Sequence, residues 1–193
     1  MNNTITYYNQ NAADFVANTQ SADMTSLYQK FLAHIPSTSH ILDLGCGSGR
    51  DTKYFMQQGY NVTAIDGTPA LCQLAQEFTG QKVHCMTFDQ IKWENKFDGI
   101  WACASILHLT KQELPSIFFK LATALKKTGY LYTSFKYGSF EGERNGRYFT
   151  DLTEKGLSVA ISASGLKIAD CWITEDVRPE RNEKWLNAIL IKE

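Results

Sequence analysis

Apolar positions recur along the chain with two different periods, one typical of strands and one of helices. Short apolar runs predict buried strands at 41–44, 62–65, 83–86, 97–102, 130–135, 166–174 and 185–191. Apolar residues spaced three or four positions apart predict helices at about 22–34, 50–59, 68–79, 110–125 and 153–164. Strands and helices therefore alternate through the first two thirds of the chain.

Local signals set several boundaries of these elements. Thr110 and Glu113 have the spacing of a capping box, although Pro115 allows that helix to begin a few residues later. The turn 127–129 ends the same helix. The stretch 136–147 is polar and rich in glycine, which predicts a loop long enough to act as a functional lid.

This order of elements predicts an α/β fold with a Rossmann-like, doubly wound, mostly parallel seven-stranded sheet and helices on both faces. The last two strands, joined by a charged turn that contains Pro179, predict an antiparallel hairpin at the sheet edge. We expect one domain over 1–193, with an N-terminal helix or lid segment at 1–36 and the core at 37–193. Ligands of such sheets bind at the carboxyl ends of the strands.

The amino-acid composition disfavours several classes of function for this protein. The 193 residues include 19 basic and 20 acidic side chains, and a net charge of -1 does not favour binding to a polyanion. Five scattered cysteines lack the spacing of a zinc site, so we expect free thiols in a reducing compartment and no metal. The sequence has no signal-peptide pattern and no long apolar run, which predicts a cytoplasmic protein without membrane contact.

The segment ILDLGCGSGR at 41–50 is the main candidate for chemistry. It predicts a buried strand, a tight turn with Gly45, Gly47 and Gly49, and the start of a helix. Glycines let a ligand approach the backbone, and the first amides of a helix can bind polar or anionic groups. The turn alone suits nicotinamide, flavin, nucleotide or S-adenosylmethionine (SAM) binding, or tight packing without a ligand.

Carboxylates and an aromatic residue at strand ends extend this candidate site. Asp66 can accept both hydroxyls of a ribose, or can simply end the strand and cap the next helix. Asp43 is a carboxylate in an apolar strand, satisfied either by a ligand cation or by internal partners. Phe88 and Asp89 can stack on and hydrogen-bond to adenine, or can be a core side chain and a loop aspartate.

Together these segments resemble the class I SAM-dependent methyltransferases. The resemblance rests on ILDLGCGSGR at 41–50, VTAID at 62–66, FD at 88–89 and FDGIWACASILHL at 97–109. Three further segments are similar to a small bacterial branch that includes tellurite-resistance-type methyltransferases: SFKYG at 134–138, GRYFTDLT at 146–153 and RNEKWLNAIL at 181–190.

The resemblance implies that SAM is the cofactor and S-adenosylhomocysteine the product. The expected cofactor site comprises Asp43, Gly45, Cys46, Gly47, Gly49, Asp66, Gly67, Phe88, Asp89, Ala102 and Ser105. In it the glycines pass close to the methionine part, Asp66 holds the ribose, and Phe88 and Asp89 frame the adenine. The backbone of 102–105 lies beside the sulfonium, and 106–108 leads into the acceptor pocket.

Methyl transfer by in-line displacement needs alignment of the acceptor and exclusion of water more than a nucleophile. His108 is the candidate general base; the alternative is a histidine hydrogen-bonded within its loop. The candidate substrate residues are Tyr8, His108, Lys136, Arg144, Arg147 and Tyr148. The arginines among them can bind an anionic substrate, or can pair with Glu141 and Glu143 on the surface.

The leading prediction is an enzyme that transfers a methyl group from SAM to a small molecule. Three alternatives stay open: a tRNA methyltransferase, a SAM-binding protein without turnover, and an NAD-dependent oxidoreductase. The last is disfavoured because the turn reads GxGxG and not GxGxxG. The acceptor and the oligomeric state, monomer or dimer, are not specified by these patterns.

Overall fold

A central sheet of seven strands organises the chain in the computed structural model, which describes residues 2–178 and 181–193. The strand order is β3 (Val83–Cys85), β2 (Asn61–Asp66), β1 (His40–Leu44), β4 (Phe97–Ala102), β5 (Leu125–Lys136), β9 (Lys184–Lys192), β8 (Leu166–Glu175). The pairs among β1 to β5 are parallel, while β9 runs antiparallel to both β5 and β8. The predicted Rossmann-like sheet with an antiparallel edge is confirmed. The predicted turn residue Pro179 lies outside the described residues.

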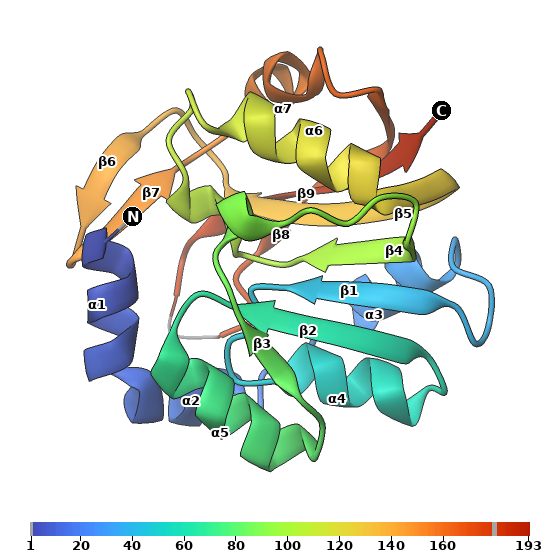
Figure 1. Ribbon diagram of the computed structural model, residues 1–193. Helices are drawn as coiled ribbons and strands as arrows, with labels where there is room; N and C mark the ends of the chain where they lie inside the picture. The colour runs from blue at the N-terminus through green and yellow to red at the C-terminus, as the bar shows by residue number, and fades with distance from the viewer. Residues whose placement is uncertain (1, 179–180) are drawn as a thin grey trace.

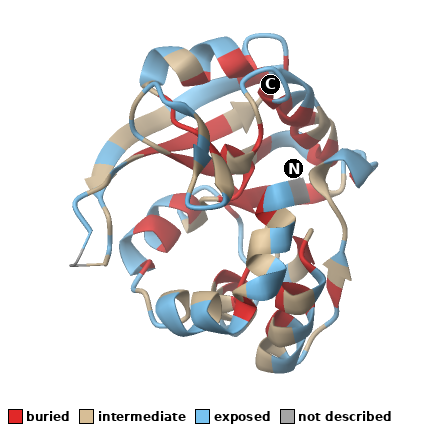
Figure 2. Cartoon of the chain, turned by 90° about the vertical axis from the view of Figure 1, so that its left-hand side faces the viewer, coloured by how far each residue is buried: buried red, intermediate tan, exposed pale blue. Residues whose placement is uncertain are grey.

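Helices cover both faces of this sheet (Figure 1). On one face lie α6 (Leu114–Ala124) and α7 (Glu154–Ile161); on the other lie α3 (Thr25–Leu32), α4 (Arg50–Gln57) and α5 (Pro69–Thr79). Figure 2 shows that buried residues gather on the strands and on the inward sides of the helices. No helix in the described ranges has both the length and the apolar character needed to cross a lipid bilayer.

Two N-terminal helices and a small hairpin lie at the edge where the parallel strands end. They are the N-terminal helices α1 (Asn2–Gln10) and α2 (Ala12–Thr19), and a two-stranded hairpin of β6 (Glu141–Arg144) and β7 (Arg147–Thr150). Figure 1 shows α1 beside this hairpin. The Tyr148 amide donates to the Thr4 hydroxyl over 3.0 Å, and the Asn3 amide donates to Glu143 over 2.9 Å. The hairpin and α1 therefore form one wall over the strand ends.

The hairpin corrects the prediction of a loop over 136–147. Asn145 and Gly146 both have positive φ, 50° and 77°, as the two-residue turn of a tight hairpin requires. The strands that flank them pair from Arg144 and Arg147 outward. The Asn-Gly dipeptide was the sequence signal for this hairpin, and the polar composition around it obscured the strands.

The two ends of α6 and the start of β5 also differ from the predicted boundaries. The Thr110 amide donates to Glu113 over 2.8 Å, as the capping-box spacing predicted, but the helix itself begins only at Leu114, next to Pro115. The predicted turn at 127–129 lies inside β5, where Thr128 adopts a φ of 61°. The strand accommodates it because the register with β4 shifts at that point.

Candidate functional site

Two adjoining cavities lie where β1, β2 and β4 end. The larger has a volume of about 350 Å³ and the smaller about 100 Å³. The two cavities share six lining residues, which come from the N-terminal helices, the glycine turn and the loop after β4: Tyr8, Phe15, Gly45, Gly47, Ala104 and His108. The ligand position predicted from the doubly wound fold therefore coincides with these cavities.

The glycine turn is held closely against the protein itself. Gly45 has a φ of +75°, and a Cβ built there would lie 2.6 Å from the Cβ of Ser105. Its amide and that of Cys46 each donate to the Ile65 carbonyl over 2.9 Å. Gly47 lies under the ring of Phe15, which a Cβ would approach to 3.0 Å. The absence of side chains thus lets β2, the loop after β4 and α2 converge on one turn.

Asp66 connects this turn to the smaller cavity. One carboxylate oxygen accepts from the Gly47 amide over 3.0 Å and the other from the Thr68 amide over 2.8 Å. Burial raises the pKa of Asp66, and the hydrogen bonds from Thr68 and Gly47 act in the opposite direction. Because a carboxylate has about four acceptor positions, Asp66 keeps room for hydroxyl donors of a ligand.

The remainder of the smaller cavity is mostly apolar. Phe88 and Leu71 line it together with Gly67 and Ser105. The Ser105 hydroxyl is buried and has no hydrogen-bond partner within the described chain. Four predicted cofactor residues, Asp66, Gly67, Phe88 and Ser105, are therefore brought together here with the glycine turn.

Three other predicted cofactor residues line neither of the two cavities. Asp43 is buried beneath the turn and accepts a hydrogen bond of 2.5 Å from the Thr52 hydroxyl; its pKa is raised by burial and by nearby Asp51. Gly49 lies at the start of α4, packed against α5. Ala102 is the fully buried last residue of β4, and Ala104 takes its predicted place at the cavity.

Asp89 also lies outside both cavities. It belongs to the short 3-10 turn η1 (Phe88–Gln90) and is exposed. Its backbone carbonyl accepts a hydrogen bond from Lys120. Only Phe88 of the predicted adenine pair therefore faces the smaller cavity.

Two predicted substrate residues, Arg144 and Tyr148, do not line the larger cavity. Arg144 forms two hydrogen bonds, of 3.0 and 2.7 Å, with the buried carboxylate of Asp151. The predicted pairing of Arg144 with Glu141 or Glu143 was thus wrong, because Asp151 follows β7 on the same hairpin. The Tyr148 hydroxyl donates to Glu141 over 3.0 Å at the surface.

One side of the larger cavity is built on a buried carboxylate that the sequence patterns did not single out. Asp51, in the first turn of α4, accepts from Arg50 Nε over 2.6 Å, from Trp101 Nε1 over 2.8 Å and from the Tyr28 hydroxyl. Burial alone would raise the pKa of Asp51, but these donors hold it below its usual range. Arg50 also donates to the Thr19 carbonyl over 3.1 Å, which ties α2 to the glycine turn.

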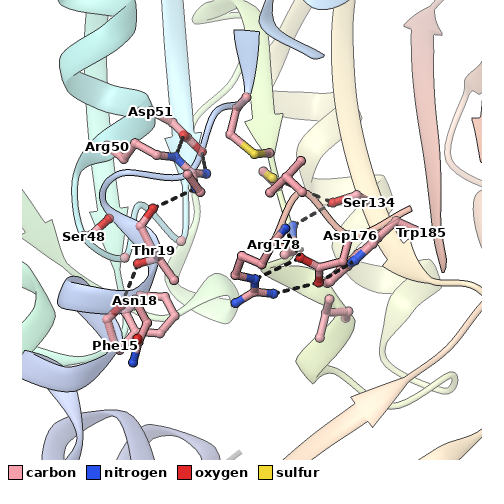
Figure 3. Close-up of a pocket in the computed structure, with 18 of the residues that line it drawn as sticks. Phe15, Asn18, Thr19, Ser48, Arg50, Asp51, Ser134, Asp176, Arg178 and Trp185 are labelled. Atoms are coloured by element: carbon pink, nitrogen blue, oxygen red, sulfur yellow. Dashed lines mark hydrogen bonds and ion pairs between the residues drawn. The ribbon is translucent and has the colours of Figure 1, made fainter. Parts of the chain in front are cut away.

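The facing side comes from the β8–β9 connection (Figure 3). Asp176 accepts from Arg178 over 2.9 and 2.8 Å and from Trp185 Nε1 over 3.1 Å. Burial would raise the pKa of Asp176, but these hydrogen bonds lower it to about 2. Sequence reasoning missed this group because no local motif marks residues that only the edge strands bring to the cavity.

His108 joins three separate elements at the boundary between the cavities. It lies in the turn η2 (Ile106–His108), with Nδ1 2.6 Å from the Tyr148 carbonyl and Nε2 3.1 Å from the Tyr8 hydroxyl. A carbonyl only accepts, so Nδ1 carries the proton and Nε2 accepts from Tyr8. Burial lowers the pKa of His108 to about 4, and the charges of Arg147 and Lys136 act in the same direction.

This buried histidine predicts an acid-sensitive fold. Above pH about 6.5 the ring is neutral in both folded and unfolded chains and does not affect stability. As the pH falls toward 4, the unfolded chain takes up a proton that the folded one resists, so the free energy of unfolding decreases. Urea unfolding at pH 7 and 4.5 should show a loss about 2 kcal/mol larger for the wild type than for His108→Gln. Equal losses would contradict a buried neutral ring.

Comparisons with known proteins agree with this geometry. A family model described as "Methyltransferase domain" matches residues 41–129. A curated relative is the protein named "Putative methyltransferase YqeM" of Bacillus subtilis strain 168. It is 27% identical over 115 residues, which cover 54% of this chain and 47% of YqeM. The matched part thus spans about half the length of that curated relative.

Solved structures extend the similarity over nearly the whole chain. A Burkholderia thailandensis 1,6-didemethyltoxoflavin-N1-methyltransferase, with bound 1,6-didemethyltoxoflavin and S-adenosylhomocysteine, has a TM-score of 0.80 and 23% identity, covering 97% of this chain and 86% of that one. A TehB-like SAM-dependent methyltransferase from Corynebacterium glutamicum has a TM-score of 0.74 and 22% identity, covering 97% and 100%. Residues 41–129 therefore match the model of the methyltransferase domain, and the chain as a whole has the Rossmann-like fold of these solved SAM-dependent methyltransferases.

Proposed function

We propose that this protein transfers a methyl group from SAM to a small molecule. The observation that carries the proposal is the pair of cavities that meet at the glycine turn, one suited to a nucleoside and one to a second ligand. The Burkholderia structure, which has the same fold and holds 1,6-didemethyltoxoflavin and S-adenosylhomocysteine, supports a site for two ligands.

The adenosine of SAM would occupy the smaller cavity. Asp66 would accept from the ribose hydroxyls with its remaining acceptor positions, and Phe88 would lie against the adenine. The methionine part would extend past Gly45 and Gly47 into the larger cavity. Ala104, which lines both cavities, would then lie nearest the sulfonium.

The residues around the reacting atoms would orient the acceptor and exclude water rather than form a covalent bond with it. Burial raises the pKa of the Cys103 thiol to about 12, so no thiolate nucleophile is present at neutral pH. Both ring nitrogens of His108 are engaged, and its low pKa makes it a weak base. We assign His108 a positioning role: it holds Tyr8 of α1 against the hairpin.

A binding and turnover experiment tests the proposal. Calorimetry with SAM and S-adenosylhomocysteine should show one site per chain, while NADH, which suits the alternative oxidoreductase, should give no heat. With methyl-labelled SAM, label should then enter a small-molecule fraction of a cell extract and not its RNA. No SAM binding, or binding without any transfer of label, would contradict the proposal; label in RNA would favour the tRNA alternative.

A further inference from the structure

The basic side chains described around the larger cavity lie close to carboxylates, except for Arg147. Arg50, Lys136, Arg178 and Arg181 line the cavity, and each has a carboxylate oxygen within 4 Å: Asp51, Glu183, Asp176 and Glu183, respectively. Arg147 lines the same cavity, and no carboxylate among residues 2–178 and 181–193 lies within that distance of it. Arg147 is therefore the basic side chain of this cavity that no described carboxylate pairs with.

The surroundings of Arg147 do not satisfy its hydrogen bonds either. Its guanidinium carbon lies 4.6, 5.7 and 5.2 Å from the ring centres of Tyr7, Tyr8 and Phe149. These rings attract the cation, but the guanidinium has five N–H donors that seek acceptors. One bond to the Tyr8 hydroxyl is long, at 3.4 Å, and Nε is buried without a partner. A charged donor withdrawn from water is costly unless a ligand supplies the acceptor.

The position of Arg147 favours the methyl acceptor over the methyl donor as that ligand. Arg147 lines the larger cavity and does not line the smaller one, where Asp66 and Phe88 lie. It begins β7 of the hairpin, whereas the glycine turn follows β1. The Lys136 Nζ atom lies 5.1 Å from the centre of the same Phe149 ring, but Lys136 forms an ion pair with Glu183. A guanidinium that no described carboxylate pairs with, placed among aromatic rings, matches a flat ligand with one negative charge.

We propose that the acceptor is a small aromatic carboxylate and that Arg147 binds its carboxylate group. Carboxylates take two parallel hydrogen bonds from a guanidinium, which fixes the plane of the ligand as well as its position. The rings of Tyr7, Tyr8 and Phe149 would contact its aromatic body. This inference rests on the proposed function, because it assigns the second ligand of that same site.

A comparison of two isosteric probes tests this assignment. Benzoate and benzamide have the same shape and differ in charge, and calorimetry can measure both on the full chain saturated with S-adenosylhomocysteine. The wild type should bind benzoate at least about ten-fold more tightly than benzamide. Arg147→Gln should remove that preference, and Arg147→Lys should retain part of it. Lys127→Gln, which removes an exposed charge that lines neither cavity, should leave the preference unchanged.

Several outcomes would overturn the inference. Equal binding of the two probes would contradict a carboxylate site. So would a failure of both probes to bind at about 20 mM, the range in which a fragment of this size binds. Tighter binding of inorganic phosphate than of benzoate would assign a different anion. A ten-fold loss of S-adenosylhomocysteine affinity in Arg147→Gln would show that Arg147 serves the donor. If S-adenosylhomocysteine does not bind the wild type, the proposed function is contradicted. The affinities of benzoate and benzamide, measured in the absence of S-adenosylhomocysteine, would still test whether Arg147 binds a carboxylate.

Discussion

Asp66→Ala is expected to weaken S-adenosylhomocysteine binding at least about a hundred-fold, because two ribose hydroxyls would lose their acceptor. Hydrogen bonds to a charged group contribute about 1.5–3 kcal/mol each. The substitution also removes the acceptor of the Gly47 and Thr68 amides, which shape the cavity wall. Calorimetric titration of purified variant and wild type measures the change in Kd.

Two further variants separate ligand contact from folding. Asp66→Asn keeps one carbonyl acceptor for a backbone amide, so its thermal stability should lie closer to the wild type while its affinity stays low. Asp98→Asn removes a carboxylate at the opposite end of the sheet, where Asp98 accepts from the His40 amide and from Lys126, and should leave affinity unchanged. A Kd for Asp66→Ala within three-fold of wild type, with the fold intact, would contradict the ribose role.

Gly45→Ala is expected to lower the free energy of unfolding by about 3 kcal/mol. The new methyl group would lie 2.6 Å from the Cβ of Ser105, and overpacking of this kind costs about 1–3 kcal/mol. The φ of +75° adds about 1–2 kcal/mol for any residue with a Cβ. Because relief of the contact would move the loop after β4, the affinity for S-adenosylhomocysteine should decrease as well.

Gly59→Ala provides the matched control for this substitution. Gly59 has a similar φ of +86°, but a Cβ there meets no atom within 4 Å. It should therefore lose only the backbone contribution, about 1 kcal/mol, and keep full ligand affinity. Urea unfolding of both variants measures the difference. Equal losses at the two positions would show that the contact with Ser105 is not a constraint on the turn.

The sequence was most informative where one side chain has one local role. Apolar runs and glycines predicted β1, the turn after it and α4, because such strands and turns follow short-range rules. Asp66 was predicted at the cavity because it directly ends the strand next to the glycine turn. A helix or lid segment was predicted over 1–36, and Phe15 of α2 packs on Gly47.

Features that depend on pairing between strands far apart in the sequence were harder to predict. Asp176 and Trp185 reach the larger cavity only because β9 pairs with β5 as well as with β8. The β8–β9 hairpin was predicted, but no local pattern encodes the pairing of β9 with β5. Arg144 and Arg147 looked equivalent in the sequence. The two are direct partners in the strand register of the hairpin, yet Arg144 pairs with Asp151 while Arg147 lines the cavity, a difference set by the side chains around each.

The topology separates the parts of the site along the chain. The residues proposed for the methyl donor follow β1, β2 and β4 and lie between positions 45 and 108. The opposite wall comes from β5, β7 and the β8–β9 connection, all beyond position 130. Substitutions in this later region can reshape the acceptor side without touching the glycine turn or Asp66. Because Tyr7 and Tyr8 of α1 also line the acceptor side, exchange of the later segment between relatives would alter part of that side while the donor residues at 45–108 stay in place.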